Sequence, residues 1–183
     1  LTVGWMDSVN TPFAGGDYLI VQYRPFAGNQ TKNDTILAKC EATPERFLVS
    51  RTGDPRVTVA SRLTDPDNAV WEVWRNDTLL GIILLDHVDP GVDARLHFVF
   101  FDDDLASKAA VLQAFMAQYF TLGFERLTLE VPEHMSTLIG FARKKLGFRY
   151  EGDDQRGARR ERAYFDGAAW YDTVALRVLR GDA

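Results

Sequence analysis

The chain has 183 residues, of which 46% are hydrophobic, 12% are aromatic and 26% are charged, and its formal net charge is −5. This length suits a single domain with a hydrophobic core, and the aromatic content excludes a mainly disordered chain. The negative charge argues against a protein that binds nucleic acid through bulk charge. No apolar run approaches the roughly 18 residues of a membrane-spanning helix, and no secretory signal peptide opens the sequence. We therefore expect a cytoplasmic protein with no membrane partner.

The cysteine and histidine content argues against a metal centre. The single cysteine, Cys40, can form neither an internal disulfide nor a multi-cysteine site. The three histidines, at positions 87, 97 and 134, lack a metal-ligand spacing such as HExxH. We expect no bound metal.

Residues 1–42 differ from the rest in composition, because Asn, Thr, Gly and Gln are frequent and the aromatic residues follow no period. We interpret this segment as an N-terminal arm of irregular structure. Its one predicted strand lies at 18–23, where the sequence Tyr-Leu-Ile-Val-Gln-Tyr favours β structure. The arm is expected to pack on the rest of the protein, and the alternative is a segment that binds a protein partner. Residues 43–183 are predicted to form the main domain.

The main domain is predicted to begin with a short helix and a strand. Thr43 and Pro44 are typical of a helix start, and the Gly-Asp-Pro at 53–55 would end that helix. Residues 56–60 favour a strand, and the Asp-Pro-Asp-Asn at 65–68 favours a turn.

From residue 69 onward, period-2 alternation, apolar stripes at helical spacing and turn residues predict seven strands and two helices. The strands are predicted at 69–75, 79–88, 94–101, 126–131, 148–151, 163–165 and 170–179, and the helices at 105–122 and 134–146. The order β-β-β-α-β-α-β-β-β predicts a mixed α/β protein. Its central sheet would be mostly antiparallel and flanked by helices.

Three stretches carry a family resemblance, which as a whole covers about residues 43–180. They are Leu-Gly-Ile-Ile-Leu-Leu at 80–85, Leu-Glu-Val at 129–131 with Lys-Leu-Gly-Phe at 145–148 and Glu-Gly at 151–152, and the final hairpin from 163 to 172. In this order they resemble the GNAT superfamily of acyl-CoA-dependent N-acetyltransferases, especially the branch that acetylates the alanine of ribosomal proteins. The resemblance implies a GNAT-like fold, acetyl-CoA as donor, and a small-molecule or protein amine as acceptor.

The stretch that corresponds to the family's pyrophosphate-binding loop departs from its pattern. GNAT proteins carry Arg/Gln-x-x-Gly-x-Gly/Ala there, because glycine lets backbone amides at a helix N-terminus approach the pyrophosphate. Asp104, Ser107 and Ala109 stand at these positions, and the aspartates at 102–104 would cap the helix while repelling a pyrophosphate. The resemblance therefore implies a degenerate loop.

In the corresponding arrangement, the strand before this loop would hold the pantetheine arm and the helix after it the pyrophosphate. Lys108 would add one compensating charge. The implied donor-binding residues are Val99, Phe100, Phe101, Ser107, Lys108, Ala109 and Ala110.

Acetyl transfer to an amine needs a base. Glu130 matches the carboxylate that serves as base in the alanine-acetylating branch, and His97 lies where other family members place a glutamate. Alternatively, Glu130 is an ordinary strand residue that faces solvent, and His97 is a core or edge histidine whose hydrogen bonds are satisfied within the fold. The family's acidic tyrosine has no counterpart at 141–144, which leaves Tyr150 and Tyr164 as substitutes, or a thiolate that departs without an enzymic acid.

The segment 151–162 holds four arginines and four acidic residues. It could bind an acidic substrate or the 3′-phosphate of coenzyme A. We favour a solvated loop in which these charges neutralise one another.

Two functions remain open from the sequence. One is an acetyl-CoA-dependent N-acetyltransferase that acts on a primary amine. The other is a catalytically inactive GNAT-fold protein that serves as a binding or structural module. Because the run 141–152 also resembles GNAT-like proteins of tailed bacteriophages, the second function includes a virion-associated protein.

Overall fold

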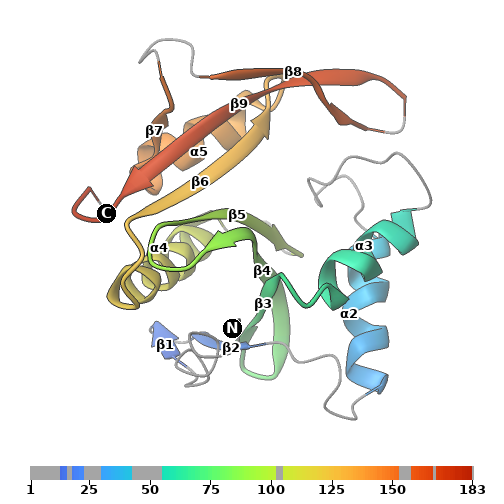
Figure 1. The fold of residues 1–183 in the computed structure, drawn as a ribbon. Coiled ribbons are helices and arrows are strands. Elements are labelled where there is room, and N and C mark those ends of the chain that lie inside the picture. The colour runs from blue at the N-terminus through green and yellow to red at the C-terminus, as the bar shows by residue number, and fades with distance from the viewer. Residues whose placement is uncertain are drawn as a thin grey trace.

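The computed structural model describes residues 13–15, 18–22, 30–42, 55–101, 105–152, 158–166 and 168–182. Nine described strands form one sheet in the order β1-β2-β3-β4-β5-β6-β9-β7, and β8 also pairs with β9 (Figure 1). The strands are β1 (Phe13–Gly15), β2 (Tyr18–Gln22), β3 (Ala69–Arg75), β4 (Thr78–Asp89), β5 (Asp93–Phe100), β6 (Arg126–Pro132), β7 (Arg149–Tyr150), β8 (Arg159–Phe165) and β9 (Trp170–Leu179). The described helices are α2 (Gln30–Ala42), α3 (Pro55–Thr64), α4 (Leu105–Thr121) and α5 (Ser136–Lys145).

The predicted fold class and the element order from residue 69 onward are confirmed. All strand pairs are antiparallel except β5 with β6, which is parallel because α4 crosses over between them. The turn between β3 and β4 forms where Asn76 and Asp77 both adopt the left-handed conformation, with φ of 46° and 63°. These two residue types tolerate that conformation, which matches the twist of a tight hairpin.

The N-terminal part of the chain contains more helix than the sequence predicted. The strand predicted at 18–23 is confirmed as β2, but α2 occupies residues that we interpreted as an irregular arm. Within α2, Ile36 and Cys40 are buried, and this single pair at helical spacing is too weak a stripe to recognise from the sequence. The helix predicted to start at Thr43 lies outside the described residues.

The strand predicted at 56–60 is wrong, because these residues form α3. Two β-branched valines, Val57 and Val59, favour a strand locally, whereas Pro55 suits the first turn of a helix. At the other end of α3, Leu63 is buried in a cluster with residues of α2. This packing between helices outweighs a local strand preference of a few tenths to ~1 kcal/mol.

The helices cover the two faces of the sheet. Residues of α4 and α5 belong to the larger core cluster on one face, and residues of α2 and α3 belong to the smaller cluster on the other. Figure 1 shows α2 and α3 packed together beside the half of the sheet that contains β3, β4 and β5. No helix among the described residues is long and apolar enough to cross a membrane.

Neighbouring residues of β4, β5 and β6 point to opposite faces. Leu85, Leu96 and Leu129 are buried in the larger cluster with α4 and α5. The residues next to them, among them Asp86 and Glu130, therefore face the side of α2 and α3. The fold thus lines one face of the central strands with ionisable side chains.

The pairing between β5 and β6 is short. The two strands pair from Asp93 with Arg126 to Arg95 with Thr128. Both strands are described over their whole length and continue for several residues beyond this point, yet no further pair joins them. They diverge in Figure 1, so the sheet splits into a half ending at β5 and a half beginning at β6.

Candidate active site

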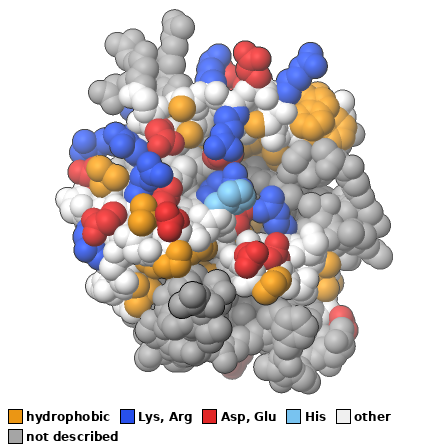
Figure 2. All heavy atoms as spheres, viewed as in Figure 1, with side chains coloured by type: hydrophobic (Ala, Val, Ile, Leu, Met, Phe, Trp, Pro, Cys, Tyr) orange, Lys and Arg blue, Asp and Glu red, His pale blue; other side chains and the backbone are white. Residues whose placement is uncertain are grey.

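Ionisable side chains from five elements converge where β5 and β6 separate. They connect to one another through hydrogen bonds and ion pairs. The members of this cluster are Arg62 of α3, Asp86 of β4, Arg95 and His97 of β5, Glu130 of β6 and Arg160 of β8. We call it the splay cluster. In Figure 2, Lys or Arg and Asp or Glu side chains lie next to one another around the centre of the view.

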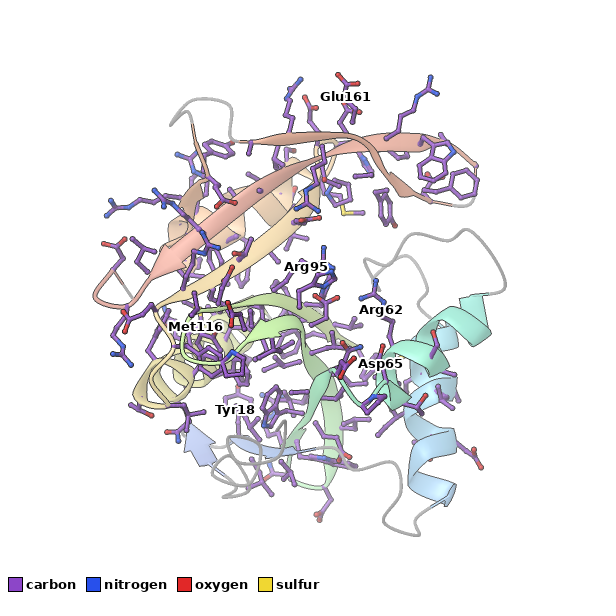
Figure 3. All side chains as sticks on the ribbon, viewed as in Figure 1. Tyr18, Arg62, Asp65, Arg95, Met116 and Glu161 are labelled. Atoms are coloured by element: carbon purple, nitrogen blue, oxygen red, sulfur yellow. The ribbon has the colours of Figure 1, made fainter. Side chains whose placement is uncertain are left out.

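Asp86 is the buried centre of the splay cluster and is only 1% exposed. The Arg95 guanidinium donates from Nε to Oδ1 over 2.7 Å and from Nη2 to Oδ2 over 3.2 Å. Arg62 donates to Oδ2 as well, and Figure 3 shows Arg62 and Arg95 extending toward the same space from α3 and β5. Burial alone would raise the pKa of Asp86, but hydrogen bonds and charge from His97 and Arg95 hold that pKa well below its usual range. Asp86 is therefore a carboxylate at neutral pH.

The ionised Asp86 determines which nitrogen of His97 carries a proton. His97 Nε2 lies 3.1 Å from Asp86 Oδ2. A carboxylate can only accept, so Nε2 must donate, and in the neutral ring Nδ1 is then the nitrogen with the free lone pair. The His97 side chain is 16% exposed. This arrangement is that of a base oriented by a buried carboxylate.

Glu130 is held between two arginines. Its Oε2 lies 3.3 Å from Arg95 Nη1, and its Oε1 lies 2.9 Å from Arg160 Nη1. The Glu130 side chain is 14% exposed, so it is not the solvent-facing strand residue that was its alternative interpretation. Because Arg95 also binds Asp86, it joins Glu130 to the Asp86–His97 pair.

The two bases predicted from the sequence thus lie in one network on neighbouring strands. Sequence reasoning missed Asp86, Arg95 and Arg62. The sequence did contain a signal for Asp86, because this residue directly follows a long apolar run in β4, and the structure shows that the buried part of the strand includes it. A charged residue at such a position needs partners, but the sequence does not say which residues provide them.

Two arginines of the segment 151–162 pair outside it. Arg159 and Arg160 belong to β8, and among the described residues they pair with Glu133 and Glu130. Their side chains point to opposite faces, since Arg159 lies opposite Val174 of the larger core cluster and Arg160 lies opposite Thr173. Residues 153–157 lie outside the described part of the chain.

The two candidate acids have neighbours of their own. Tyr150 lies against Arg143, whose guanidinium carbon is 4.3 Å from the ring centre. Tyr164 is buried, and its ring centre lies 6.4 Å from Tyr171 and 6.5 Å from His134. His134, exposed before α5, lies against Tyr171, with ring centres 4.1 Å apart and the ring planes tilted by 43°.

The register of β5 decides which of its backbone groups face the gap beside β6. The Phe101 N–H donates to the Leu80 carbonyl of β4 over 2.8 Å, so Phe101 and Val99 direct their backbone toward β4. The intervening residues, Phe98 and Phe100, direct theirs toward β6, beyond the last pair of those strands. Of the three residues predicted to hold pantetheine, Phe100 alone has this orientation, and Phe98, which the sequence analysis did not name, shares it.

The residues predicted to hold the pyrophosphate lie in the first turns of α4. Ser107, Lys108 and Ala109 are half-buried and Ala110 is exposed. Lys108 Nζ lies 5.9 Å from the Phe100 ring centre, which brings its charge close to the end of β5. The aspartates at 102–104 lie outside the described residues. Among the described residues, no three His, Cys, Asp or Glu side chains are grouped as a metal site.

The sequence matches no protein-family model and shows no significant similarity to any curated protein. Solved structures, by contrast, match the fold along nearly the whole chain. A probable acetyltransferase of the GNAT family from Chromobacterium violaceum matches with a TM-score of 0.69 and 17% identity over 94% of this chain and 93% of its own.

Two other matches carry more specific descriptions. A Salmonella typhimurium acetyl transferase that modifies the N-terminal serine of ribosomal protein L7/L12 has a TM-score of 0.70 and 13% identity over 93% of this chain and 99% of its own. The Vibrio cholerae spermidine N-acetyltransferase, solved with CoA and spermine, has a TM-score of 0.67 and 11% identity over 91% and 97%. At these identities the comparisons establish that the chain has the GNAT fold.

Proposed function

We propose that this chain is an acetyl-CoA-dependent N-acetyltransferase that acts on a primary amine. The observation that carries the proposal is the separation of β5 from β6 with the splay cluster beside it. There, the backbone groups of Phe98 and Phe100 point into the gap beyond the last pair of β5 with β6, and an extended amide chain could hydrogen-bond along this part of β5. Proteins of the same fold bind CoA, as in the spermidine N-acetyltransferase complex.

The donor would lie along the edge of β5 that diverges from β6, with pantetheine beside Phe98 and Phe100. Its pyrophosphate would reach the first turn of α4 at Ser107, where the helix dipole favours an anion, whereas the amides of Ala109 and Ala110 lie further along and are bonded within the helix. Lys108 would supply the positive charge. This loop is degenerate because it lacks the family's glycines, so we expect weaker binding than a glycine-rich loop allows.

The splay cluster would supply the proton transfers. The acceptor's ammonium group loses a proton to His97 Nδ1, and the free amine attacks the thioester carbonyl carbon. The new C–N bond forms and the C–S bond breaks, and the thiolate takes up the second proton lost by nitrogen. Glu130 would bind the incoming amine, since its two oxygens already contact cationic groups.

Calorimetric titration of CoA and acetyl-CoA into the protein tests donor binding. We expect saturable binding that Lys108→Glu weakens, because the substitution reverses a positive charge that lies 5.9 Å from the Phe100 ring centre. Lys144→Glu, an equal change on an exposed position of α5, is the control and leaves binding unchanged.

Transfer to a panel of amines then tests catalysis. His97→Gln and Glu130→Gln are expected to lower kcat/KM by roughly 10²–10⁴ while CoA binding persists. Absence of CoA binding at millimolar ligand refutes the proposal. It leaves the catalytically inactive module, with or without a place in a virion, as the function to test.

A further inference from the structure

The splay cluster carries an excess of positive charge. Among the described residues, three guanidinium groups, from Arg62, Arg95 and Arg160, contact two carboxylates, those of Asp86 and Glu130. His97 and His87, which both lie 3.1 Å from Asp86, add no charge in their neutral forms. Glu161, the neighbour of Arg160, extends away from Arg62 and Arg95 in Figure 3 and does not offset the excess. An acceptor that brings several positive charges would therefore be repelled from this site.

The two arginines that hold Glu130 differ in their freedom to move. Arg95 is fixed, because it lies mostly buried and also makes two hydrogen bonds to Asp86. Arg160 is 65% exposed, and within the described part of the chain its side chain pairs with Glu130 alone. An ion pair with such an exposed arginine contributes little to stability, so an incoming cation can replace it.

Replacement of Arg160 at Glu130 has a consequence for the acceptor. When an ammonium group takes the place of Arg160 at Oε1, the released guanidinium lies close to the bound acceptor. A carboxylate on the acceptor would then pair with Arg160, and a second ammonium group would meet its repulsion. After this exchange every charge stays paired only if the acceptor carries both an ammonium group and a carboxylate.

We infer that the acceptor of this enzyme carries an anionic group close to its reactive amine, and that Arg160 is the residue that selects for it. The inference rests on the proposed function and adds the substrate class. Two sources share this chemistry: a free amino acid, whose own carboxylate lies beside the amine, and a peptide amino terminus followed by an acidic side chain. Polyamines such as spermidine belong to the class that the site rejects.

Steady-state acetylation of matched acceptors tests the inference. One arm compares alanine with alaninamide, and the other compares three tetrapeptide amides that differ only at the second position, which is Asp, Asn or Lys. Spermidine is included as a polycation. We expect kcat/KM to be at least about 10-fold higher for the anionic member of one arm, and that arm identifies the source.

Variants of β8 assign the preference to Arg160. Arg160→Ala should remove the preference and Arg160→Glu should shift it toward the lysine peptide, while KM for acetyl-CoA stays unchanged. Arg159→Glu makes the same charge reversal one residue earlier, on the opposite face of the strand, and should keep the wild-type preference.

Equal rates for charged and neutral acceptors, a preference for spermidine, or a preference that survives Arg160→Ala would each overturn the inference. In those cases acetyl transfer itself is intact, so the proposed function stands. If no acceptor is acetylated and CoA does not bind, the proposed function has failed and the inference falls with it.

Discussion

The substitution Asp86→Asn removes the one buried negative charge that joins α3, β4 and β5. In the folded protein the carboxylate accepts hydrogen bonds from Arg62, Arg95 and His97. An asparagine of nearly the same shape offers one neutral oxygen and turns two N–H donors toward the guanidinium groups. The substitution therefore leaves Arg95, which is mostly buried, next to an uncompensated donor.

The expected loss of stability depends on whether Arg62 and Arg95 keep another partner or can be hydrated. Removing one partner of a buried ion pair typically lowers the free energy of unfolding by about 3–5 kcal/mol. Arg95 retains Glu130, and Arg62 is 32% exposed and can be hydrated, so we expect a value near the lower end, about 3 kcal/mol. For a chain of this length, that corresponds to a melting temperature lower by roughly 6–12 °C.

Urea unfolding followed by circular dichroism at pH 7 measures this loss. The control is Asp182→Asn, which removes a partner of Arg149 at 3.5 Å in an exposed ion pair and should change stability by less than about 0.5 kcal/mol. A loss below about 1 kcal/mol for Asp86→Asn would refute the argument that the splay cluster is organised around a buried charge.

The pH dependence of the same experiment has a definite sign. Because the pKa of Asp86 is lowered in the folded protein, the unfolded chain takes up the proton first as the solution is acidified. The stabilisation from Asp86 is therefore complete above its unfolded pKa of about 4 and is lost progressively as the pH falls below that value. The difference between wild type and Asp86→Asn should shrink as the pH falls below about 4. A difference that grows below that pH would contradict the assignment.

Three further predictions concern the core. Gly81→Ala would direct a methyl group against the Val99 carbonyl of β5, where the backbone must shift, and should lower the free energy of unfolding in urea by about 1–3 kcal/mol. Leu112→Ala opens a cavity at a fully buried position of α4 and should lower it by about 2–5 kcal/mol, with unchanged secondary structure by circular dichroism. Cys40 is fully buried between α2 and the sheet, so a thiol reagent should label it only as fast as the protein opens, and rapid labelling of the native protein would contradict that packing.

The strands and helices after residue 69 could be predicted because their signals are local. Period-2 alternation marks β3, and the Asn-Asp pair at 76–77 supplies the left-handed turn that follows it. The stripe of Leu112, Phe115 and Tyr119 marks α4, and all three side chains are buried as expected. Each of these signals lies within one element and its adjoining turn, so no knowledge of distant contacts was needed.

The helices before residue 69 could not be predicted in this way. Neither α2 nor α3 has a strong stripe of its own, and the valines of α3 favour a strand. Their helical structure depends on mutual packing and on the smaller core cluster, in which Leu63 meets Ile36 and Cys40. Contacts between segments far apart in the chain outweigh local preferences here.

The candidate site shows the same division. The sequence by itself determined that Glu130 and His97 lie in strands of a mixed sheet, and the motif around Glu130 made both candidates for proton transfer. Tertiary structure alone decided their partners, because strand register places Asp86 opposite Arg95 and ends the pairing of β5 with β6 at Thr128. The residue types of a strand indicate which of its faces is buried. Which strands and helices lie next to that face depends on how the whole sheet packs on its helices. The charged residues of a buried site therefore find their partners only in the tertiary structure.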